Sequence, residues 1–305
     1  MRIYLAGDNL KKYIIPYVHD DLSRGGVHAN LNPFFKSLPD KLNAQAMEEK
    51  MQVFLAGVAP WRGGQDKLYD AEVKKHRPYI LESFYYVDED TERLLPYYGD
   101  FLLDSGAFTF MGGFNYRDNS KGVDFYEYAD RYAAFINKHN VQKFFELDVD
   151  VCIGYDKVKE LRRYLEQKTN KQPIPVWHST RGREDFLRCC DEYPYVALGG
   201  IVGGEWSAKA ERFIPWFISE AHKRGAKIHG LGYTKLDKLR EYHFDSVDST
   251  AWTAGNRFGF VFWFDGKTMQ KKQAPAGHRI IAPRAAALNN YIEWIKFQRY
   301  AETHL

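Results

Sequence analysis

The chain has 305 residues, 45% of them hydrophobic and 16% aromatic, which is enough material for one large core. Its 43 Lys and Arg residues nearly balance its 40 Asp and Glu residues, and the formal net charge is +3. The molecule as a whole therefore does not attract nucleic acid strongly over a distance, and any basic binding surface must be local. The three cysteines, with Cys189 and Cys190 adjacent, exclude a regular disulfide framework and favour a reducing cytoplasm. No apolar run approaches the roughly 20 residues that cross a bilayer, so we expect a soluble protein with no membrane partner.

Residues 1–50 precede the first regular alternation of apolar and polar stretches. We interpret them as an N-terminal extension to one domain over residues 51–305. Residues 1–7 are echoed by residues 51–57, which is either a partial duplication or, as we favour, two similar strand starts. The extension either packs beside the domain or covers its site.

Eight short apolar runs follow, separated for the most part by helix-like stretches rich in Lys, Glu, Arg and Leu. This alternation is typical of βα units, and eight parallel strands are the number that closes a barrel. Aromatic residues at helical spacing predict helices over residues 122–138 and 207–224. We therefore predict an α/β fold, a (β/α)8 TIM barrel, with strands over residues 53–56, 79–83, 101–104, 144–148, 174–178, 195–199, 227–230 and 244–247.

The segment after the eighth run has its own character. An aromatic run over residues 258–264, followed by the turn dipeptide Asp265-Gly266, predicts a hairpin. Residues 266–284 contain five Lys or Arg and no Asp or Glu, so this is the clearest basic segment of the chain. It is either a phosphate-binding surface or a solvated face. An amphipathic helix over about residues 284–302 is expected to close the barrel.

Polar side chains stand where several predicted strands end. Because the carboxyl ends of parallel barrel strands share one rim, where the following loops build the active site, we expect these side chains to converge. Converging carboxylates are costly unless a substrate or a proton uses them. The predicted rim residues are Asp104, Asp148, Asp150, His178, Glu205 and Asp245.

Four segments carry the most specific motifs, in chain order. They are Leu-Asp-Ser-Gly-Ala-Phe at residues 103–108, Asp-Val-Asp-Val-Cys at 148–152, the glycine-rich residues 198–205, and His-Gly-Leu-Gly at 229–232 with Phe-Asp-Ser-Val-Asp-Ser-Thr at 244–250 and Gly-Asn-Arg at 255–257. In this order, over about residues 51–265, they resemble the tRNA-guanine transglycosylase family. The resemblance implies a barrel enzyme that breaks and remakes the bond between a nucleoside's base and its sugar.

The resemblance also assigns the reacting groups. Asp245, in the Phe-Asp-Ser-Val segment, takes the place of the family's nucleophile, and Asp104 takes that of its general acid/base. Phe108 takes the place of the ring that stacks on the base. Asp248, three residues after Asp245, is the alternative nucleophile. An Asp-Ser-Gly sequence after a strand is also an ordinary turn, so Asp104 has a structural interpretation too.

The remaining assignments concern the base. Asp150, or Asp148 if the alignment slips, matches the base-recognising aspartate, because a carboxylate can accept from N1–H and the 2-amino group of guanine together; capping of the next helix is the alternative. His178 stands where the family often has a Gln, and His229 replaces a Met that covers the base. The resemblance places Gly199, Gly200, Ile201, Glu205 and Gly230 along the base as well, with one extra residue before Glu205.

The main departure is the family's zinc site, a cluster of three cysteines and a later histidine. No cysteine follows Cys190, so we expect no metal. The reaction that the resemblance implies also needs no other cofactor. The basic segment stands in its place and predicts phosphate contacts from Arg257, Lys271, Lys272, Arg279 and Arg284. This pattern is most similar to the branch that places 7-deazaguanine bases in DNA, in bacteria or phage-infected cells.

We therefore expect an enzyme that exchanges guanine in DNA, or in RNA, for a free 7-deazaguanine base such as preQ0. The target nucleotide must leave its stack, with Trp177 or Trp252 joining Phe108 in replacing the lost stacking. The alternatives are a DNA N-glycosylase that uses water, a tRNA-guanine transglycosylase, an inactive nucleic-acid-binding barrel, and an unrelated barrel with a phosphate site at residues 199–204.

Overall fold

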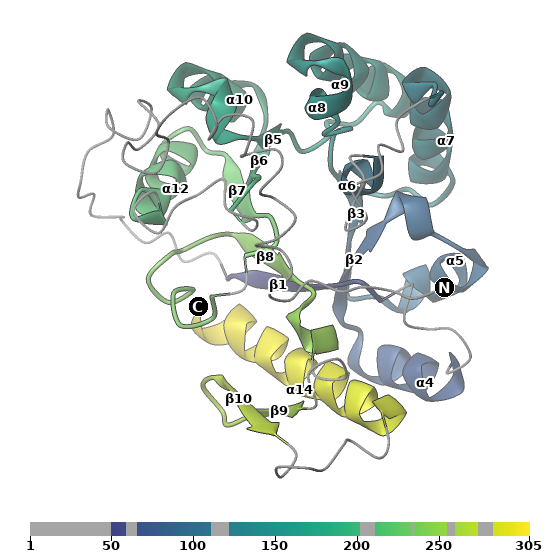
Figure 1. The fold of residues 1–305 in the computed structure, drawn as a ribbon, viewed down its shortest axis with the longest axis vertical. Coiled ribbons are helices and arrows are strands. Elements are labelled where there is room, and N and C mark those ends of the chain that lie inside the picture. The colour runs from purple at the N-terminus through teal and green to yellow at the C-terminus, as the bar shows by residue number, and fades with distance from the viewer. Residues whose placement is uncertain are drawn as a thin grey trace, which may run out of the picture.

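The computed structural model describes residues 50–58, 66–110, 122–201, 211–233, 235–254, 260–273 and 283–305. They form a (β/α)8 barrel-like fold, as predicted, in which eight parallel strands curl into one sheet (Figure 1). The strands are β1 (Gln52–Ala56), β2 (Tyr79–Ser83), β3 (Asp100–Asp104), β4 (Lys143–Phe144), β5 (Val176–Trp177), β6 (Tyr195–Leu198), β7 (Lys227–Gly230) and β8 (Ser246–Ser249).

The sheet has the order β4-β3-β2-β1-β8-β7-β6-β5, so β4 and β5 are its edges. They meet through an isolated parallel bridge between Phe145 and Ile174, which we call the β4–β5 seam. Beyond this bridge, a side chain replaces the backbone ladder: Oε1 of Glu146 accepts from the backbone N of Val176 at 2.7 Å. The curl is therefore closed by one bridge and by side chains.

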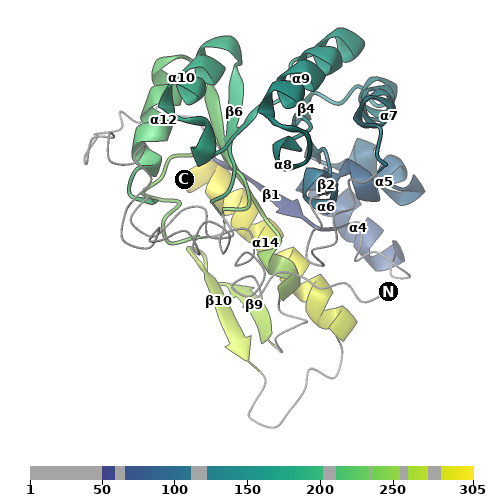
Figure 2. The same cartoon turned by 45° about the horizontal axis from the view of Figure 1, so that its top comes forward.

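Helices cover the outer side of the sheet (Figures 1 and 2). The predicted helix over residues 122–138 is confirmed as α7 (Phe125–Lys138), which begins after Asp124, whose carboxylate accepts from two backbone N–H groups of the first turn. The second predicted helix is described as α12 (Ile214–Lys223).

None of the helices in the described ranges is long and apolar enough to span a membrane. The others before the C-terminal segment are α4 (Asp66–His76), α5 (Glu89–Leu94), α6 (Ala107–Phe110), α8 (Asp150–Ile153), α9 (Tyr155–Thr169) and α10 (Arg183–Glu192), with short 3-10 turns at Phe84–Tyr86, Leu95–Tyr97, Ser179–Arg181 and Ala251–Thr253.

Alternate strand residues point into the barrel and fill it. Much of the interior is apolar, and its apolar residues include Phe54, Leu81, Leu102, Phe145 and Val176. The barrel is therefore a packed core rather than a pore, and we look for a ligand site at its ends.

The eighth strand differs from its predicted position. β8 begins at Ser246, two residues later than the predicted start at residue 244. Phe244 instead packs outside the barrel, 5.4 Å from the ring of Tyr233 between centroids, and is 2% exposed. The carboxyl end of β8 is therefore Ser249 rather than Val247, and this shift decides which aspartate reaches the rim.

The C-terminal helix α14 (Pro283–His304) confirms the predicted final helix and lies against β1. On its far side it carries the predicted hairpin, formed by β9 (Phe260–Phe264) and β10 (Met269–Gln273) (Figure 2). At the turn, Oδ1 of Asp265 accepts from the backbone N of Thr268 at 2.9 Å. Oδ1 of Asn290 accepts from the backbone N of Phe262 at 2.7 Å and fixes the hairpin on the helix.

Gln298 of α14 completes the sheet where β1 and β2 diverge. Its Nε2 donates to the carbonyls of Val53 at 2.6 Å and Tyr79 at 2.9 Å, and its Oε1 accepts from the backbone N of Tyr79 at 2.9 Å. The side chain of Gln298 is fully buried, so water cannot replace it as the hydrogen-bond partner of these backbone groups. One amide therefore ties the last helix to two strands.

Replacing this amide should cost stability. We expect Gln298→Leu to lower the free energy of unfolding by about 3 kcal/mol, because three hydrogen bonds are lost and buried backbone groups are left unpaired. Urea unfolding measures the change. Gln273→Leu, on the exposed strand β10, is the matched control and should change it by less than about 0.5 kcal/mol. Equal urea midpoints for the two variants would contradict this account of Gln298.

Candidate active site at the carboxyl end of the barrel

Asp104 ends β3 at the carboxyl end of the barrel, where it was expected. Its Oδ2 accepts from the backbone N of Gly106 at 2.9 Å, so the turn predicted as a structural alternative is formed. Gly106 has φ +83°, and a Cβ there would lie 2.8 Å from Cβ of Tyr85, so only glycine fits the turn.

The carboxyl of Asp104 has a raised pKa. Burial raises it most, the N–H of Gly106 and the side chain of Ser83 lower it, and the negative charges of Asp248 and Asp148 raise it further, so that the pKa is about 6. The two neighbouring charges come from β8 and from the loop after β4. The charges of two carboxylates thus act on a third at this end of the barrel.

Asp248 is the second carboxylate of this group. It lies on β8 opposite Phe54 of β1 and is buried. Its Oδ1 accepts from the backbone N of Gly232 at 2.5 Å and lies 3.2 Å from Nε2 of His229. The alternative nucleophile from the sequence is therefore the aspartate of β8 whose charge acts on Asp104.

Asp245, the first choice for the nucleophile, is at the opposite end. It precedes β8, and its carbonyl accepts from the backbone N of Gln52, the first residue of β1. Its Oδ2 accepts from the backbone N of Ile228 at 2.6 Å and from Nε2 of His222 at 2.9 Å. Asp245 therefore joins the amino ends of the strands to α12, and its predicted position on the rim is wrong.

His229 also differs from its expected position. The side chain is 0% exposed and lies inside the barrel between the rings of Phe54 and Phe145, with centroids 6.5 and 5.3 Å away. It contacts Asp248 from below and does not cover a base at the surface. His229 therefore lies within β7, below the rim, and not at the surface where the resemblance implies it.

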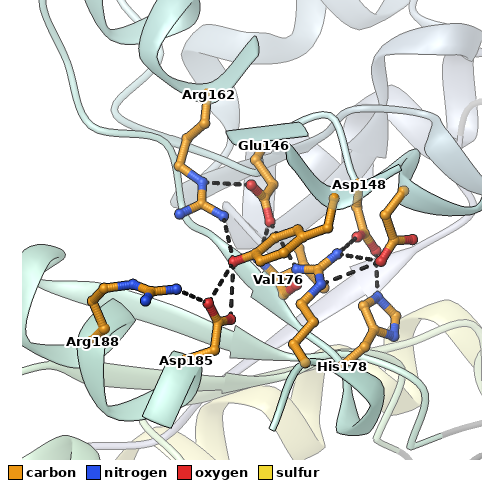
Figure 3. Close-up of polar contacts among 10 residues, drawn as sticks. Glu146, Asp148, Arg162, Val176, His178, Asp185 and Arg188 are labelled. Atoms are coloured by element: carbon orange, nitrogen blue, oxygen red, sulfur yellow. Dashed lines mark hydrogen bonds and ion pairs between the residues drawn. The ribbon is translucent and has the colours of Figure 1, made fainter. Parts of the chain in front are cut away.

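Asp148 and Asp150 contact the same arginine, Arg181, which none of the sequence motifs contains. Nη2 of Arg181 lies 2.9 Å from Oδ1 of Asp148 and 2.8 Å from Oδ2 of Asp150, and the arginine side chain is 3% exposed. Asp148 also pairs with His178 at 2.7 Å (Figure 3). Although burial alone would raise the pKa of Asp148, the charges of His178 and Arg181 hold it below its usual value.

Base recognition by Asp148 or Asp150 stays a prediction, because Arg181 engages only one oxygen of each carboxylate. Each already shares an oxygen with Arg181, which in turn lies 4.1 Å from the ring of Tyr155. Arg181 ends the short turn after His178. A basic residue this close to a histidine at the end of a strand is the feature of the sequence that points to Arg181. Its partners lie more than 30 residues away, so sequence spacing did not identify them.

Glycines of the predicted base pocket have identifiable neighbours. A Cβ at Gly199 would lie 2.7 Å from the ring of His178, so this glycine makes room for the histidine. Gly200 has φ +69°, a conformation that favours glycine. A Cβ at Gly230 would meet Phe244 at 3.1 Å, on the outside of the barrel, so Gly230 serves packing. Ile201 packs partly buried against the outer core.

The aromatic residues divide clearly. Phe108, on α6 directly after the Asp104 turn, is 50% exposed, as a stacking ring requires. Trp177 is buried and donates from Nε1 to the carbonyl of Gly182 at 2.9 Å. Trp252 is buried and donates to the carbonyl of Ala56 at 2.8 Å. Both tryptophans are core residues, and the expectation that either replaces base stacking is wrong.

The predicted phosphate-binding residues are only partly described. Lys271 and Lys272 are exposed on β10, and Nζ of Lys271 lies 5.0 Å from the ring centre of Phe260. The hairpin is thus a defined basic surface outside α14. Outside the described residues lie Glu205, Arg257, Arg279 and the side chain of Arg284. Among the described side chains, no group of three or more His, Cys, Asp or Glu is arranged to hold a metal ion.

Comparisons with known proteins add little to this geometry. No protein-family model matches the chain. It is 30% identical over 139 residues to "Uncharacterized protein 306" of Sulfolobus islandicus rod-shaped virus 1, a match that spans 42% of this chain and 44% of the viral protein. A solved structure from Aquifex aeolicus VF5, described as "Structural study of Project ID", is 12% identical with a TM-score of 0.47, covering 83% of this chain and 92% of that one.

Proposed function

We propose that this protein is a base-exchange transglycosylase that replaces guanine in a nucleic acid, DNA in the first place, with a 7-deazaguanine base such as preQ0. The observation that carries the proposal is that Asp104 and Asp248 both lie at the carboxyl end of the barrel, where burial in the first place, and the charge of Asp248 in addition, raise the pKa of Asp104 to about 6. Glycosidic bond cleavage uses such a pair, with one carboxyl that holds a proton and one ionised carboxylate.

In the proposed reaction, Asp248 replaces Asp245 as the nucleophile. An oxygen of Asp248 attacks C1′ of the sugar, the C1′–N9 bond breaks, and its electron pair goes to guanine, which takes a proton from Asp104. The incoming base then gives its N9 proton to Asp104, and its N9 attacks C1′. The bond between C1′ and Asp248 breaks and returns its electron pair to the carboxylate.

Other described residues have roles in this proposal. Phe108 stacks on the base that has left the helix, and the His178–Asp148 pair lies on the base side of the rim. Lys271 and Lys272 contact phosphates of the polymer, which makes binding sensitive to salt. The reaction consumes neither ATP nor a redox equivalent, because one glycosidic bond replaces another.

The proposal is tested by incubating the protein with guanine-labelled DNA, with and without preQ0. Release of label that depends on added preQ0, together with a 7-deazaguanine nucleoside in the digested DNA by mass spectrometry, is the expected result. Release without added base would instead identify an N-glycosylase. The same assay on tRNA separates the two polymers, and absence of release from both overturns the proposal.

The acid role of Asp104 makes a pH prediction. Because Asp104 must be protonated to assist the departing guanine, the rate of guanine release should fall tenfold per pH unit above its pKa of about 6. Single-turnover rates between pH 5 and 8 measure this limb. In Asp104→Asn the rate should be low and the limb should be missing. A limb that persists unchanged in the variant would assign it to another group.

A further inference from the structure

A line of polar side chains runs through the barrel interior beneath Asp248. Nε2 of His229 lies 3.2 Å from Oδ1 of Asp248, and Nδ1 of the same ring lies 2.5 Å from Oγ of Ser246. Oγ of Ser246 in turn bonds to the hydroxyl of Tyr195. His229 and Ser246 are both 0% exposed, so the line has no access to water along its middle.

The surroundings of this line make its hydrogen bonds directional. Phe54 and Phe145 flank His229, and an unpaired polar atom in such surroundings is costly. For a neutral imidazole, one arrangement satisfies every atom. Tyr195 donates to Ser246, Ser246 donates to Nδ1 of His229, and Nε2–H of His229 donates to Asp248.

We infer that His229 is a positioning residue, fixed as the Nε2–H tautomer by Ser246 and Tyr195, that holds one oxygen of Asp248 so that the other attacks C1′. This inference rests on the proposed function. Oδ1 of Asp248 receives two donors, His229 Nε2–H and the backbone N–H of Gly232, while Oδ2 is left for the sugar. A carboxylate fixed at one oxygen can present the other in a single orientation, which is the requirement of in-line attack.

A purely structural role would not require these residue types. The neighbouring interior positions are filled by apolar side chains such as Leu102 and Ile174, which pack a barrel without hydrogen-bond partners. A buried histidine with both ring nitrogens bonded instead links the carboxylate to the layer below it. The line therefore has a direction, from Tyr195 towards the site.

The tautomer is tested without any assay of activity. In protein labelled with ¹⁵N-histidine, long-range ¹H–¹⁵N spectra at pH 7 should show one ring with the proton on Nε2 that disappears in His229→Gln. In Ser246→Ala the same ring should shift, because its Nδ1 loses its donor. An Nδ1–H tautomer, or a doubly protonated ring, for His229 would overturn the inference.

The positioning role is tested in the base-exchange assay with a pair of substitutions. His229→Leu removes the donor and should lower kcat about 100-fold with KM nearly unchanged, whereas His229→Gln keeps an N–H donor and should recover part of that loss. His243→Leu, at an exposed position, is the control and should keep the wild-type kcat. Thermal unfolding of each variant shows whether a loss of kcat only follows a loss of fold.

The outcomes separate the two proposals. If Asp248→Asn is inactive but His229→Leu keeps kcat within twofold of the wild type, the positioning role fails and the proposed function stands. If Asp248→Asn retains full activity, Asp248 is not the nucleophile and the role of His229 fails, although base exchange itself stands. Absence of exchange in the wild-type protein overturns the proposed function. Equal losses in His229→Leu and His229→Gln would also overturn the role of the donor.

Discussion

Asp248→Asn is expected to lower the rate of base exchange by about three to four orders of magnitude, because the amide is not a nucleophile at C1′ and forms no ester with the sugar. The loss should appear in kcat, while DNA binding measured by fluorescence anisotropy stays within about threefold. No glycosyl adduct should be seen by intact-protein mass spectrometry in the variant. Trapping with an excess of DNA in the absence of preQ0 should reveal the adduct in the wild-type protein.

Asp245→Asn is the matched control because it makes the same chemical change three residues away at the other end of β8. It should leave kcat within about twofold and instead lower stability, since Oδ2 of Asp245 accepts from Ile228 and His222. The roles would be reversed if Asp245→Asn abolished exchange and Asp248→Asn did not. That result would also favour the bounds first predicted for the eighth strand, residues 244–247, which place Asp245 near the rim.

The second large effect is expected on stability, at the β4–β5 seam. Arg162 of α9 and Glu146 form a buried ion pair, with Nε of Arg162 2.6 Å from Oε2 of Glu146 and with exposed fractions of 5% and 0% (Figure 3). Removing one partner of a buried pair leaves a charge without compensation. We expect Arg162→Met to lower the free energy of unfolding by about 3 kcal/mol.

Arg163→Met is the control for this prediction, because Arg163 is the next residue of α9 and is exposed. It should change the free energy of unfolding by less than about 0.5 kcal/mol. Urea denaturation followed by circular dichroism compares the two variants. Similar midpoints would show that the Glu146 carboxylate is compensated by Arg181 alone, which lies 3.5 Å from its other oxygen.

The barrel itself was predictable from the sequence, and so was the position of Asp104. Apolar runs at regular spacing predict the strands. The Ser-Gly turn marks where β3 ends, so it places Asp104, the last residue of that strand, at the rim. The C-terminal hairpin and helix were predictable for the same reason. Each has a strong local pattern that tertiary contacts do not overturn.

The register of β8 was less accessible. Phe244 and Val247 both suit a strand, so the local sequence is equally compatible with a strand that begins two residues before the observed one. The placement of Ser246 and Asp248 inside the barrel depends on how β8 pairs with β1. That pairing begins with the hydrogen bond between Gln52 and Asp245, which are nearly 200 positions apart. Local sequence carries no trace of that contact, and the resemblance drew attention to Asp245, which lies at the amino end of the strands.

The partners of the base-side aspartates were hidden for a related reason. Asp148 and Asp150 carry the signature of a rim carboxylate, but Arg181 approaches them from a separate strand and loop. Ion pairs between loops have no fixed spacing in sequence. Burial of Trp177 and Trp252 follows equally from packing that no single segment displays.

The β4–β5 seam divides the site into a stiff part and a compliant part. Asp104 and Asp248 lie on β3 and β8, which are paired on both sides within continuous ladders, whereas Asp148 and His178 face each other across the seam. A junction held by one bridge and by side chains opens at a lower free energy than a full ladder. Local opening of this junction would therefore change the shape of the site at Asp148 and His178, while Asp104 and Asp248 stay on strands paired on both sides. Under the proposed function, differently substituted bases would then be accepted beside the same two carboxylates.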